Sequence, residues 1–195
     1  IHSKNNFKLE KIQIAYCPER VLPGNTLNEM INNDRVIGGT NNVSCDKGKA
    51  FYKAFCTGKI ITTDCNTAEM VKLTENAYRD VNIAFANELS MICDDLHIDT
   101  DHLINIANNH PRVNILKPGC GVGGHCIAVD PWFIASNSPA KSKLIQTARY
   151  VNNEKTNWVI SKLKEKIIKL KLSRGDNPIL GCLGLSFKPN IDDLR

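Results

Sequence analysis

The sequence has few aromatic residues and no long apolar segment. Phe, Trp and Tyr make up 6% of its 195 residues. No apolar run approaches the length of about 18 residues that marks a membrane-spanning helix, and no secretory leader is recognisable at the start. We therefore expect a globular protein that has no membrane partner and is, by default, cytoplasmic.

Regular cysteine spacing is also missing. The eight cysteines form no disulfide framework, which favours a reducing compartment. A zinc site built on Cys120, His125 and Cys126 would lack a fourth ligand, so we expect no metal. The net charge of +5 is partly concentrated in the lysines of 155–171, without an interleaved aromatic platform. This pattern favours a solvated helix face over nucleic-acid binding.

Glycine is concentrated in one stretch, KPGCGVGGHCIAVDP, which spans residues 117–131. Its backbone can adopt positive φ angles and approach a ligand closely. Cys126 follows the glycines, and Asp130 follows Cys126 by four residues. A thiol beside such a loop is a candidate nucleophile, although a cysteine is more often a small buried apolar residue. The glycines lack the context of a dinucleotide-binding turn, which leaves a strand and opens a helix.

The first part of the chain has the pattern of a β-α-β unit. Short apolar runs predict three strands, at 12–17, 35–38 and 60–63. The first of them is expected to be buried, and a helix around Phe51 is expected between the other two. Glu19 and Arg20 follow the first strand, at the edge where ligands bind in open α/β sheets. We therefore expect the end of a parallel sheet.

Longer helical patterns follow, at 67–96, 99–109 and 140–172, and an apolar run at 179–187 predicts another buried strand. The first helix is longer than a small domain needs, which indicates a connector or a dimer interface. Lys72 and Asn76 share one of its faces, although by spacing alone such residues are normally solvated. The chain starts at Ile1 and stops shortly after the last strand, so we expect a piece of a longer protein.

Six blocks of sequence span nearly the whole chain: YCPERVLPGN, NDRVIGG, AEMVKLTENAYRDVNIAFANELS, HPRVNIL, PGCGVGGHCIAVDPWF and GLSFKPNIDDLR. In this order they resemble the UDP-glucose/GDP-mannose dehydrogenase family. The resemblance implies an α/β fold with the end of a Rossmann-like NAD domain at 1–66. It implies a central all-helical dimerisation domain at 67–172, and at 173–195 the first strand of a second Rossmann-like domain, which binds UDP. The family's amino-terminal glycine fingerprint for NAD is absent from the sequence.

The resemblance implies a two-step, NAD-dependent oxidation of the C6 alcohol of a UDP-sugar to a carboxylate. Cys126 matches the family's nucleophile, which forms a thiohemiacetal and then a thioester. Lys72, Asn76 and Asp130 match the polar group around the reacting carbon. There, ammonium and amide groups can stabilise oxyanion charge, and a carboxylate can hold a water or accept a proton. Glu19 matches the carboxylate assigned to thioester hydrolysis.

Residues that hold substrate and cofactor are implied in the same way. The substrate-binding set comprises Arg20, Arg112, Lys117, Gly119, Gly121, Gly123 and Lys188. Arg112 matches an arginine that reaches the substrate of a partner subunit, which implies a homodimer or a larger homo-oligomer. Arg195 matches a residue near NAD. Pro23 stands where UDP-glucose enzymes have a second glutamate, which favours UDP-N-acetyl-D-mannosamine as the substrate.

Three alternatives stay open. The substrate could be UDP-glucose or another UDP-acetamido sugar. The chain could also be a non-catalytic helical dimerisation fragment that binds a nucleotide sugar weakly at most. A Cys-His hydrolase would need His97, His102 or His110 beside Cys126, and no motif ties any of them to it.

Overall fold

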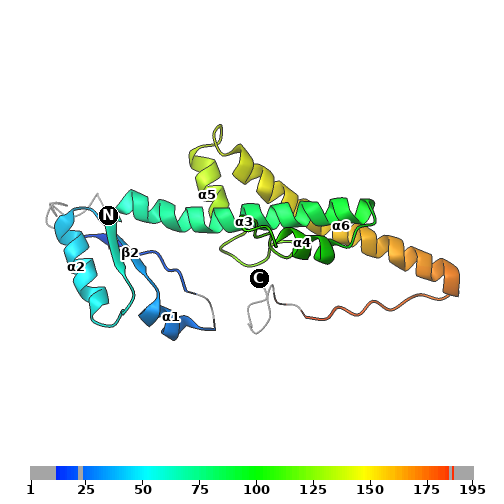
Figure 1. Ribbon diagram of the computed structural model, residues 1–195, viewed down its shortest axis with the longest axis horizontal. Coiled ribbons are helices and arrows are strands. Elements are labelled where there is room, and N and C mark those ends of the chain that lie inside the picture. The colour runs from blue at the N-terminus through cyan, green and yellow to red at the C-terminus, as the bar shows by residue number, and fades with distance from the viewer. Residues whose placement is uncertain (1–11, 22–23, 185, 187–195) are drawn as a thin grey trace, which may run out of the picture. The chain divides into compact units, whose positions relative to one another are not determined.

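The structure is a computed structural model that describes residues 12–21, 24–184 and 186. It divides into two compact units, Ile1–Thr74 and Glu75–Arg195. Helix α3 (Cys65–Asp95) begins in the first unit and continues into the second (Figure 1). The domain limits that the sequence places at 66 and 172 stay predictions.

Among the residues described, the first unit contains a three-stranded sheet in the order β1-β2-β3. Its elements are β1 (Ala15–Tyr16), α1 (Thr26–Asn32), β2 (Arg35–Gly39), α2 (Asn42–Lys53) and β3 (Ile60–Asp64). β2 and β3 run parallel, with Arg35 opposite Ile60 and Gly39 opposite Asp64. The strands predicted at 35–38 and 60–63 are therefore confirmed, together with the helix that connects them. The sequence pattern does not predict α1, a helix of seven residues with none buried.

β2 lies at the centre of this unit, and all five of its residues are buried. Two glycines allow its neighbours to approach closely. A Cβ atom on Gly38 would lie 2.5 Å from the backbone oxygen of Asp64, and one on Gly39 would lie 2.6 Å from the sulfur of Cys45. β2 therefore packs tightly against β3 and α2.

β1 differs from the prediction of a buried, parallel strand at 12–17. It contains only Ala15 and Tyr16, both exposed, and it pairs antiparallel with β2. β1 is an edge strand of the sheet. An apolar run becomes a core strand only when other layers cover both of its faces, and the exposure of these side chains shows that this condition is not met here.

The second unit is helical. After α3 come α4 (Thr100–Ala107), α5 (Asp130–Asn137) and α6 (Lys143–Arg174). The side chain of Asp99 accepts a hydrogen bond from the His102 N–H and so caps α4, and Pro131 lies in the first turn of α5. Gly175 ends α6 with a left-handed conformation at φ 75°, as is usual at helix C-termini. The predicted helices are confirmed within a few residues at each end.

α3 and α6 are joined at three levels by hydrogen bonds between side chains: Arg149 to Asp80, Asn87 to Asn152, and Lys155 to Ser90. Small residues occupy the same buried region, among them Ala77, Ala84 and Ala148. The core between these two helices therefore combines small apolar side chains with an unusually polar centre.

The apolar run at 179–187 does not form the predicted strand over its described part. Residues 179–184 have no regular secondary structure, and Ile179 and Leu183 are each 99% exposed. A strand requires neighbouring backbone groups for its hydrogen bonds, and the described part of the chain provides none at this point. No helix among the described residues has the length and apolar character needed to cross a membrane.

Candidate active site

The centre of the candidate site is a hydrogen bond between two helices. Nδ2 of Asn76, which is buried on α3, donates to Oδ2 of Asp130 at 2.5 Å. Asp130 is the first residue of α5. The amide therefore fixes one carboxylate oxygen of Asp130 at the start of this helix.

Cys126 lies one turn before Asp130. Its carbonyl oxygen accepts hydrogen bonds from the N–H groups of Val129 at 3.1 Å and Asp130 at 2.8 Å. Cys126 is exposed and unpaired, unlike a cysteine that serves as a buried packing residue. The thiol and the carboxylate therefore belong to one short, hydrogen-bonded segment, with Asn76 attached to its carboxylate end.

The glycine loop, residues 117–124, is attached to the helices behind it. The backbone N–H of Gly119 donates to Oδ1 of Asn87 at 2.8 Å, and Oγ1 of Thr156 donates to the carbonyl oxygen of Cys120 at 3.0 Å. Gly121 has φ 149°, and a Cβ atom there would lie 2.3 Å from Oγ1 of Thr156. Only glycine fits this position without displacing the loop or the threonine.

Behind the loop lies a buried ion pair. Nη1 of Arg149 is 2.6 Å from Oδ1 of Asp80, and both side chains are almost completely buried. Nδ2 of Asn152 donates to the same carboxylate oxygen at 2.8 Å. Burial raises the pKa of the Asp80 carboxyl, and the hydrogen bonds from Arg149 and Asn152 oppose this effect. Two side chains of α6 thus hold the carboxylate of Asp80 on α3.

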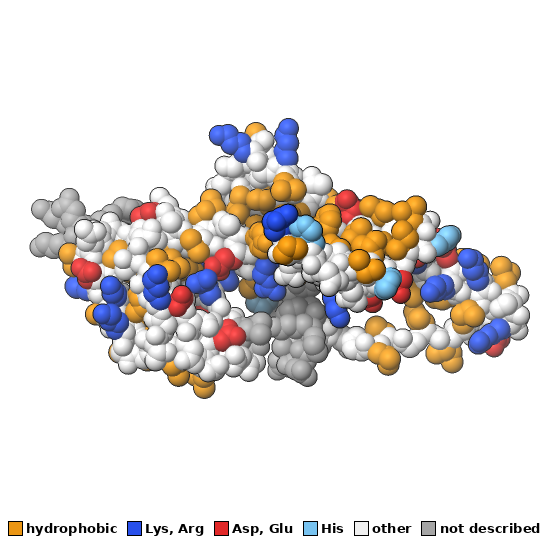
Figure 2. Space-filling model, in the orientation of Figure 1, with side chains coloured by type: hydrophobic (Ala, Val, Ile, Leu, Met, Phe, Trp, Pro, Cys, Tyr) orange, Lys and Arg blue, Asp and Glu red, His pale blue; other side chains and the backbone are white. Residues whose placement is uncertain are grey.

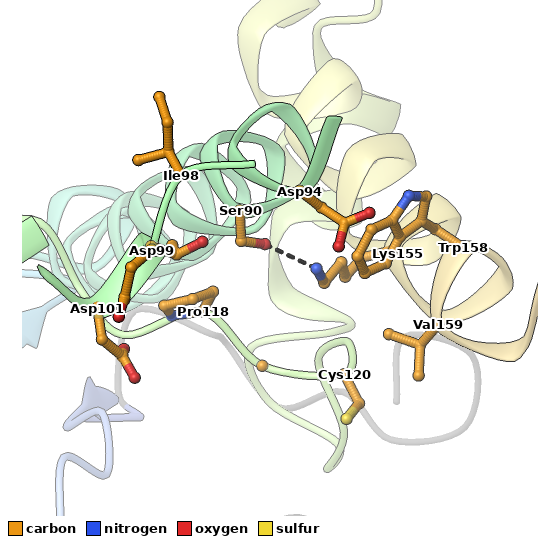
Figure 3. A pocket seen from close by; sticks show the side chains of 12 residues that line it. Ser90, Asp94, Ile98, Asp99, Asp101, Pro118, Cys120, Lys155, Trp158 and Val159 are labelled. Carbon is orange, nitrogen blue, oxygen red and sulfur yellow. Dashed lines mark hydrogen bonds between the residues drawn. The ribbon is translucent and has the colours of Figure 1, made fainter. Parts of the chain in front are cut away.

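A cavity of about 510 Å³ opens next to the loop, between α3, α4 and α6. Nζ of Lys155 donates to Oγ of Ser90 at 2.7 Å and lies 4.0 Å from the centre of the Trp158 ring. Figure 3 shows Lys155 directed toward Ser90, with Trp158 beside it and Cys120 on the neighbouring loop. Burial lowers the pKa of the Lys155 ammonium group. The cavity therefore has a cation and an aromatic ring in its wall.

The remaining predicted catalytic residues lie on the first unit. Lys72 is half-buried on α3, one turn before Asn76. Oε1 of Glu19 accepts hydrogen bonds from the N–H groups of Arg20 at 2.7 Å and Val21 at 3.1 Å. It also lies 3.7 Å from Nη1 of the buried Arg35. The carboxylate of Glu19 is thus held at the end of the segment that follows β1.

The other predicted binding residues are exposed or half-buried, or lie outside the residues that the structure describes. Lys117 and Gly123 are exposed on the loop, and Arg112 is exposed ahead of it, with its N–H donating to Nδ1 of His110. In the first unit, Nη1 of Arg20 donates to the backbone oxygen of Asp34. Three positions lie outside the described residues, namely Pro23, Lys188 and Arg195.

The residues described do not gather a metal-binding group of three or more His, Cys, Asp or Glu side chains, so the zinc alternative has no support in this part of the chain. The glycine loop also lacks the setting of a dinucleotide-binding turn. Residues 114–119 that lead into it form no strand, and α5 begins only at Asp130. A pyrophosphate cradle for NAD is therefore not part of the site described here, and the roles assigned to the individual site residues remain predictions.

Comparison with known proteins places this geometry in a family. The family model for the central domain of the UDP-glucose/GDP-mannose dehydrogenases matches residues 66–154, and the model for their NAD-binding domain matches residues 1–56. The chain belongs to the UDP-glucose/GDP-mannose dehydrogenase family. The predicted α/β fold class and the family resemblance are thereby confirmed.

Three relatives illustrate the similarity. A UDP-N-acetyl-D-mannosamine dehydrogenase of Campylobacter jejuni is 55% identical over 188 residues, which are 96% of this chain and 45% of the relative. An NDP-N-acetyl-D-galactosaminuronic acid dehydrogenase of Ralstonia nicotianae is 55% identical over 94% of this chain and 42% of the relative. The structure of a UDP-D-ManNAc dehydrogenase from Pyrococcus horikoshii superposes with a TM-score of 0.87 at 39% identity, covering 94% of this chain and 44% of that one. The chain thus spans less than half the length of these dehydrogenases.

The sequence analysis missed the residues that hold the glycine loop. Asp80 and Asn87 lie four and eleven residues after Asn76, so the three share one face of α3. On α6, Arg149, Asn152 and Thr156 have similar helical spacing. A polar row on the buried face of a long helix was therefore visible in the sequence, but its partners were not.

Proposed function

We propose that this chain is the catalytic-centre portion of an NAD-dependent nucleotide-sugar 6-dehydrogenase that converts UDP-N-acetyl-D-mannosamine to the corresponding uronate. The single observation that supports this best is the Asn76–Asp130 hydrogen bond, formed one turn from the exposed thiol of Cys126. The bond orients a carboxylate on the segment that carries the thiol, and the proposed covalent oxidation uses a thiol and a carboxylate.

The proposed covalent steps centre on Cys126. The C6 alcohol first loses a hydride from carbon and a proton from its hydroxyl group, which gives the aldehyde. The sulfur of Cys126 then bonds to C6 and releases its proton while the carbonyl oxygen takes up a proton, which gives a thiohemiacetal. Loss of a hydride from C6 and a proton from oxygen gives a thioester. Water then adds to C6, the carbon–sulfur bond breaks, and the thiol and the carboxylic acid are released. Each of the two oxidations releases one hydride, for which NAD is the acceptor when bound.

The groups around Cys126 have distinct proposed roles. Asp130, fixed by Asn76, accepts the proton of the reacting hydroxyl or holds a water. The amide of Asn76 and the ammonium group of Lys72 stabilise negative charge on the substrate oxygen. Glu19, held by two backbone N–H groups, orients the water that hydrolyses the thioester. Arg20, Lys117, Gly119, Gly121 and Gly123 bind the nucleotide sugar.

An acetamido sugar is the proposed substrate because relatives at 55% identity are named for acetamido sugars. A site that hydrogen-bonds a substrate's polar group rejects an analogue lacking it by roughly 10⁴-fold. We therefore expect UDP-N-acetyl-D-mannosamine to exceed UDP-glucose in kcat/KM by a wide margin. Similar values for the two sugars would refute this substrate assignment. UDP-N-acetyl-D-galactosamine should be assayed as a third substrate, because the Ralstonia relative is named for the corresponding uronic acid.

A homodimer is proposed with the activity. α3 carries exposed apolar side chains at seven-residue spacing, namely Tyr78, Phe85 and Ile92, and Figure 2 shows apolar side chains gathered over the helical unit. Arg112 is exposed, as a residue that reaches a partner's substrate must be. Light scattering on the purified protein would measure the mass of the assembly, and a monomer at micromolar concentration would refute the proposal.

The unpaired state of all eight cysteines supports a reducing, cytoplasmic location.

One experiment tests the proposed activity. The full-length protein and the 195-residue chain are each mixed with UDP-N-acetyl-D-mannosamine and excess NAD, and NADH is followed by absorbance. We expect two NADH per sugar from the full-length protein. We expect none from the chain alone, together with no measurable NAD binding by calorimetry, because the glycine turn that cradles NAD is absent from the sequence. No NADH from the full-length protein would favour a non-catalytic binding module, or a Cys-His hydrolase if an ester substrate were cleaved instead.

A further inference from the structure

We propose that Asn87 is a positioning residue that holds the glycine loop in its substrate-binding conformation, and that Asp80 sets the direction of the Asn87 amide through Asn152. The inference rests on the proposed function, since it concerns the loop assigned there to substrate binding. None of these three side chains belongs to the group around Cys126.

A continuous chain of hydrogen bonds links the three side chains, which are all at least 99% buried. Nδ2 of Asn152 donates to Oδ1 of Asp80 at 2.8 Å. Oδ1 of Asn152 accepts from Nδ2 of Asn87 at 2.9 Å. Oδ1 of Asn87 then accepts the N–H of Gly119 at 2.8 Å. The last step joins the buried core to the glycine loop.

The direction of this chain is determined at Asp80. An asparagine amide can point either way, because its oxygen and nitrogen have nearly the same shape. Nδ2 of Asn152 donates to Oδ1 of Asp80 at 2.8 Å and also to the backbone oxygen of Asp80 at 3.1 Å. Carboxylate and carbonyl oxygens only accept hydrogen bonds, so Asp80 requires the nitrogen of Asn152 to face it. The oxygen of Asn152 is then left for Asn87, which must present its nitrogen. As a result, the oxygen of Asn87 faces Gly119, where a nitrogen would meet the N–H group and repel it.

Arg149 favours the ionised form of the Asp80 carboxyl group, which only accepts hydrogen bonds. Its Nη1 contacts Oδ1 of Asp80 at 2.6 Å, and its Nη2 donates to Oδ1 of Asn153 at 3.0 Å. Without a cation, a carboxyl group buried to this extent would tend to take up a proton and become a donor. The ion pair therefore supports the orientation of Asn152 that the backbone oxygen of Asp80 also requires.

A second attachment acts on the next residue of the loop. Oγ1 of Thr156 donates to the carbonyl oxygen of Cys120 at 3.0 Å. An N–H and a C=O of adjacent residues are thus fixed from α3 and α6, respectively. A loop that is already ordered loses less conformational freedom when substrate binds. Loss of the Asn87 contact should therefore raise KM more than it lowers kcat.

Two variants of the full-length protein separate positioning from general stability. Asn87→Leu keeps the branched shape but removes the acceptor for Gly119. The matched control is Asn82→Leu, because Asn82 lies on the same helix and its Nδ2 donates to the backbone oxygen of Tyr78 within α3. If Asn87→Leu does not fold, Asn87→Ser takes its place, since a serine hydroxyl is too short to reach Gly119.

Two measurements are made on each folded variant. One is amide hydrogen exchange of peptides covering 117–122 by mass spectrometry, and the other is KM and kcat for UDP-N-acetyl-D-mannosamine. For Asn87→Leu we expect about tenfold faster exchange and an about tenfold higher KM, since a lost hydrogen bond is worth roughly one decade in an equilibrium constant. We expect kcat to change by less than about threefold. Asn82→Leu should change neither quantity.

Unchanged exchange over 117–122 in Asn87→Leu would overturn the inference, and so would an equal rise in exchange in the control Asn82→Leu. These results are distinct from failure of the proposed function. If the wild-type protein formed no NADH, the activity assignment would fall, but the exchange measurement would still decide whether Asn87 holds the loop.

Discussion

Asn76 and Asp130 are separated by 54 residues of sequence, yet the amide of one donates directly to the carboxylate of the other at 2.5 Å. The bond connects the middle of α3 with the first residue of α5. It therefore joins a residue of the long helix to the segment that carries Cys126, and it can be tested by exchanging the two side chains.

In Asn76→Asp, two carboxylates would face each other, and we expect the free energy of unfolding to fall by about 1–3 kcal/mol at neutral pH. The double variant Asn76→Asp/Asp130→Asn restores an amide–carboxylate pair with the donor on the other helix, so stability should largely return. NADH formation should not return, because the carboxylate now lies on α3. Urea denaturation and the NADH assay on the full-length protein measure the two effects. Recovery of activity together with stability would contradict the role assigned to Asp130.

The two cysteines of the stretch 117–131, Cys120 and Cys126, offer a second test. Cys126→Ala in the full-length enzyme should bind substrate almost normally but form no uronate, because a thioester can no longer form. Cys120→Ala is the matched control, since the contact of Cys120 with Thr156 uses only its backbone oxygen. Product identity and NADH yield under single-turnover conditions provide the measurement. Two NADH per sugar from Cys126→Ala at a near wild-type rate would rule out the covalent mechanism.

Two glycines of the loop should respond differently to the same substitution. A Cβ atom on Gly121 would lie 2.3 Å from Oγ1 of Thr156, and φ is 149° there, whereas a Cβ atom on Gly119 would come no closer than 3.5 Å to its nearest neighbour. We expect Gly121→Ala to lower the free energy of unfolding by about 1–3 kcal/mol and Gly119→Ala to change it far less. Thermal denaturation of both variants decides this. Equal destabilisation would show that the contact with Thr156 is not the cause.

A surface ion pair should make stability depend on pH. Nζ of Lys162 lies 2.6 Å from Oδ2 of Asp94, and its hydrogen bond lowers the pKa of the Asp94 carboxyl below the ordinary value. A lowered pKa in the folded state adds stability above the unfolded-state pKa, and this stability is lost as the pH falls through the folded-state value. Asp94→Asn should thus be less stable than wild type at pH 7, with a difference that shrinks below about pH 4 and at high salt. Urea denaturation at several pH values measures the difference in free energy of unfolding between the two proteins. A difference that does not change with pH would refute this prediction.

Helices were more predictable than strands, because their signals are local. The N-cap at Asp99, the proline in the first turn of α5 and Gly175 after α6 each act within one turn of their own helix. A strand instead depends on its neighbours. The apolar runs at 12–17 and 179–187 have strand composition, but the first gives only the exposed edge strand β1 and the described part of the second gives none.

The candidate site shows the same division between local and distant information. The four-residue spacings of Lys72 with Asn76 and of Cys126 with Asp130 could be obtained from the sequence. The proximity of Asn76 and Asp130 was implied only by the family resemblance, since nothing in the residues of either segment specifies the other. Asn87 was harder still, because an asparagine on a helix is normally solvated, and its burial depends on Asn152 and Gly119.

The spacing of partners along α6 has a consequence for insertions and deletions. Arg149, Asn152 and Thr156 lie within two turns of α6. Arg149 contacts Asp80, and Asn152 contacts both Asp80 and Asn87. Thr156 donates to the carbonyl oxygen of Cys120. One added or removed residue between positions 149 and 156 would shift the later positions by about 1.5 Å along the helix axis and turn them by about 100°. The ion pair and the attachment to the loop could then no longer form together. The distance along α6 between these residues is therefore as tightly constrained as their chemical identity, and changes of length between Arg149 and Thr156 should not be tolerated.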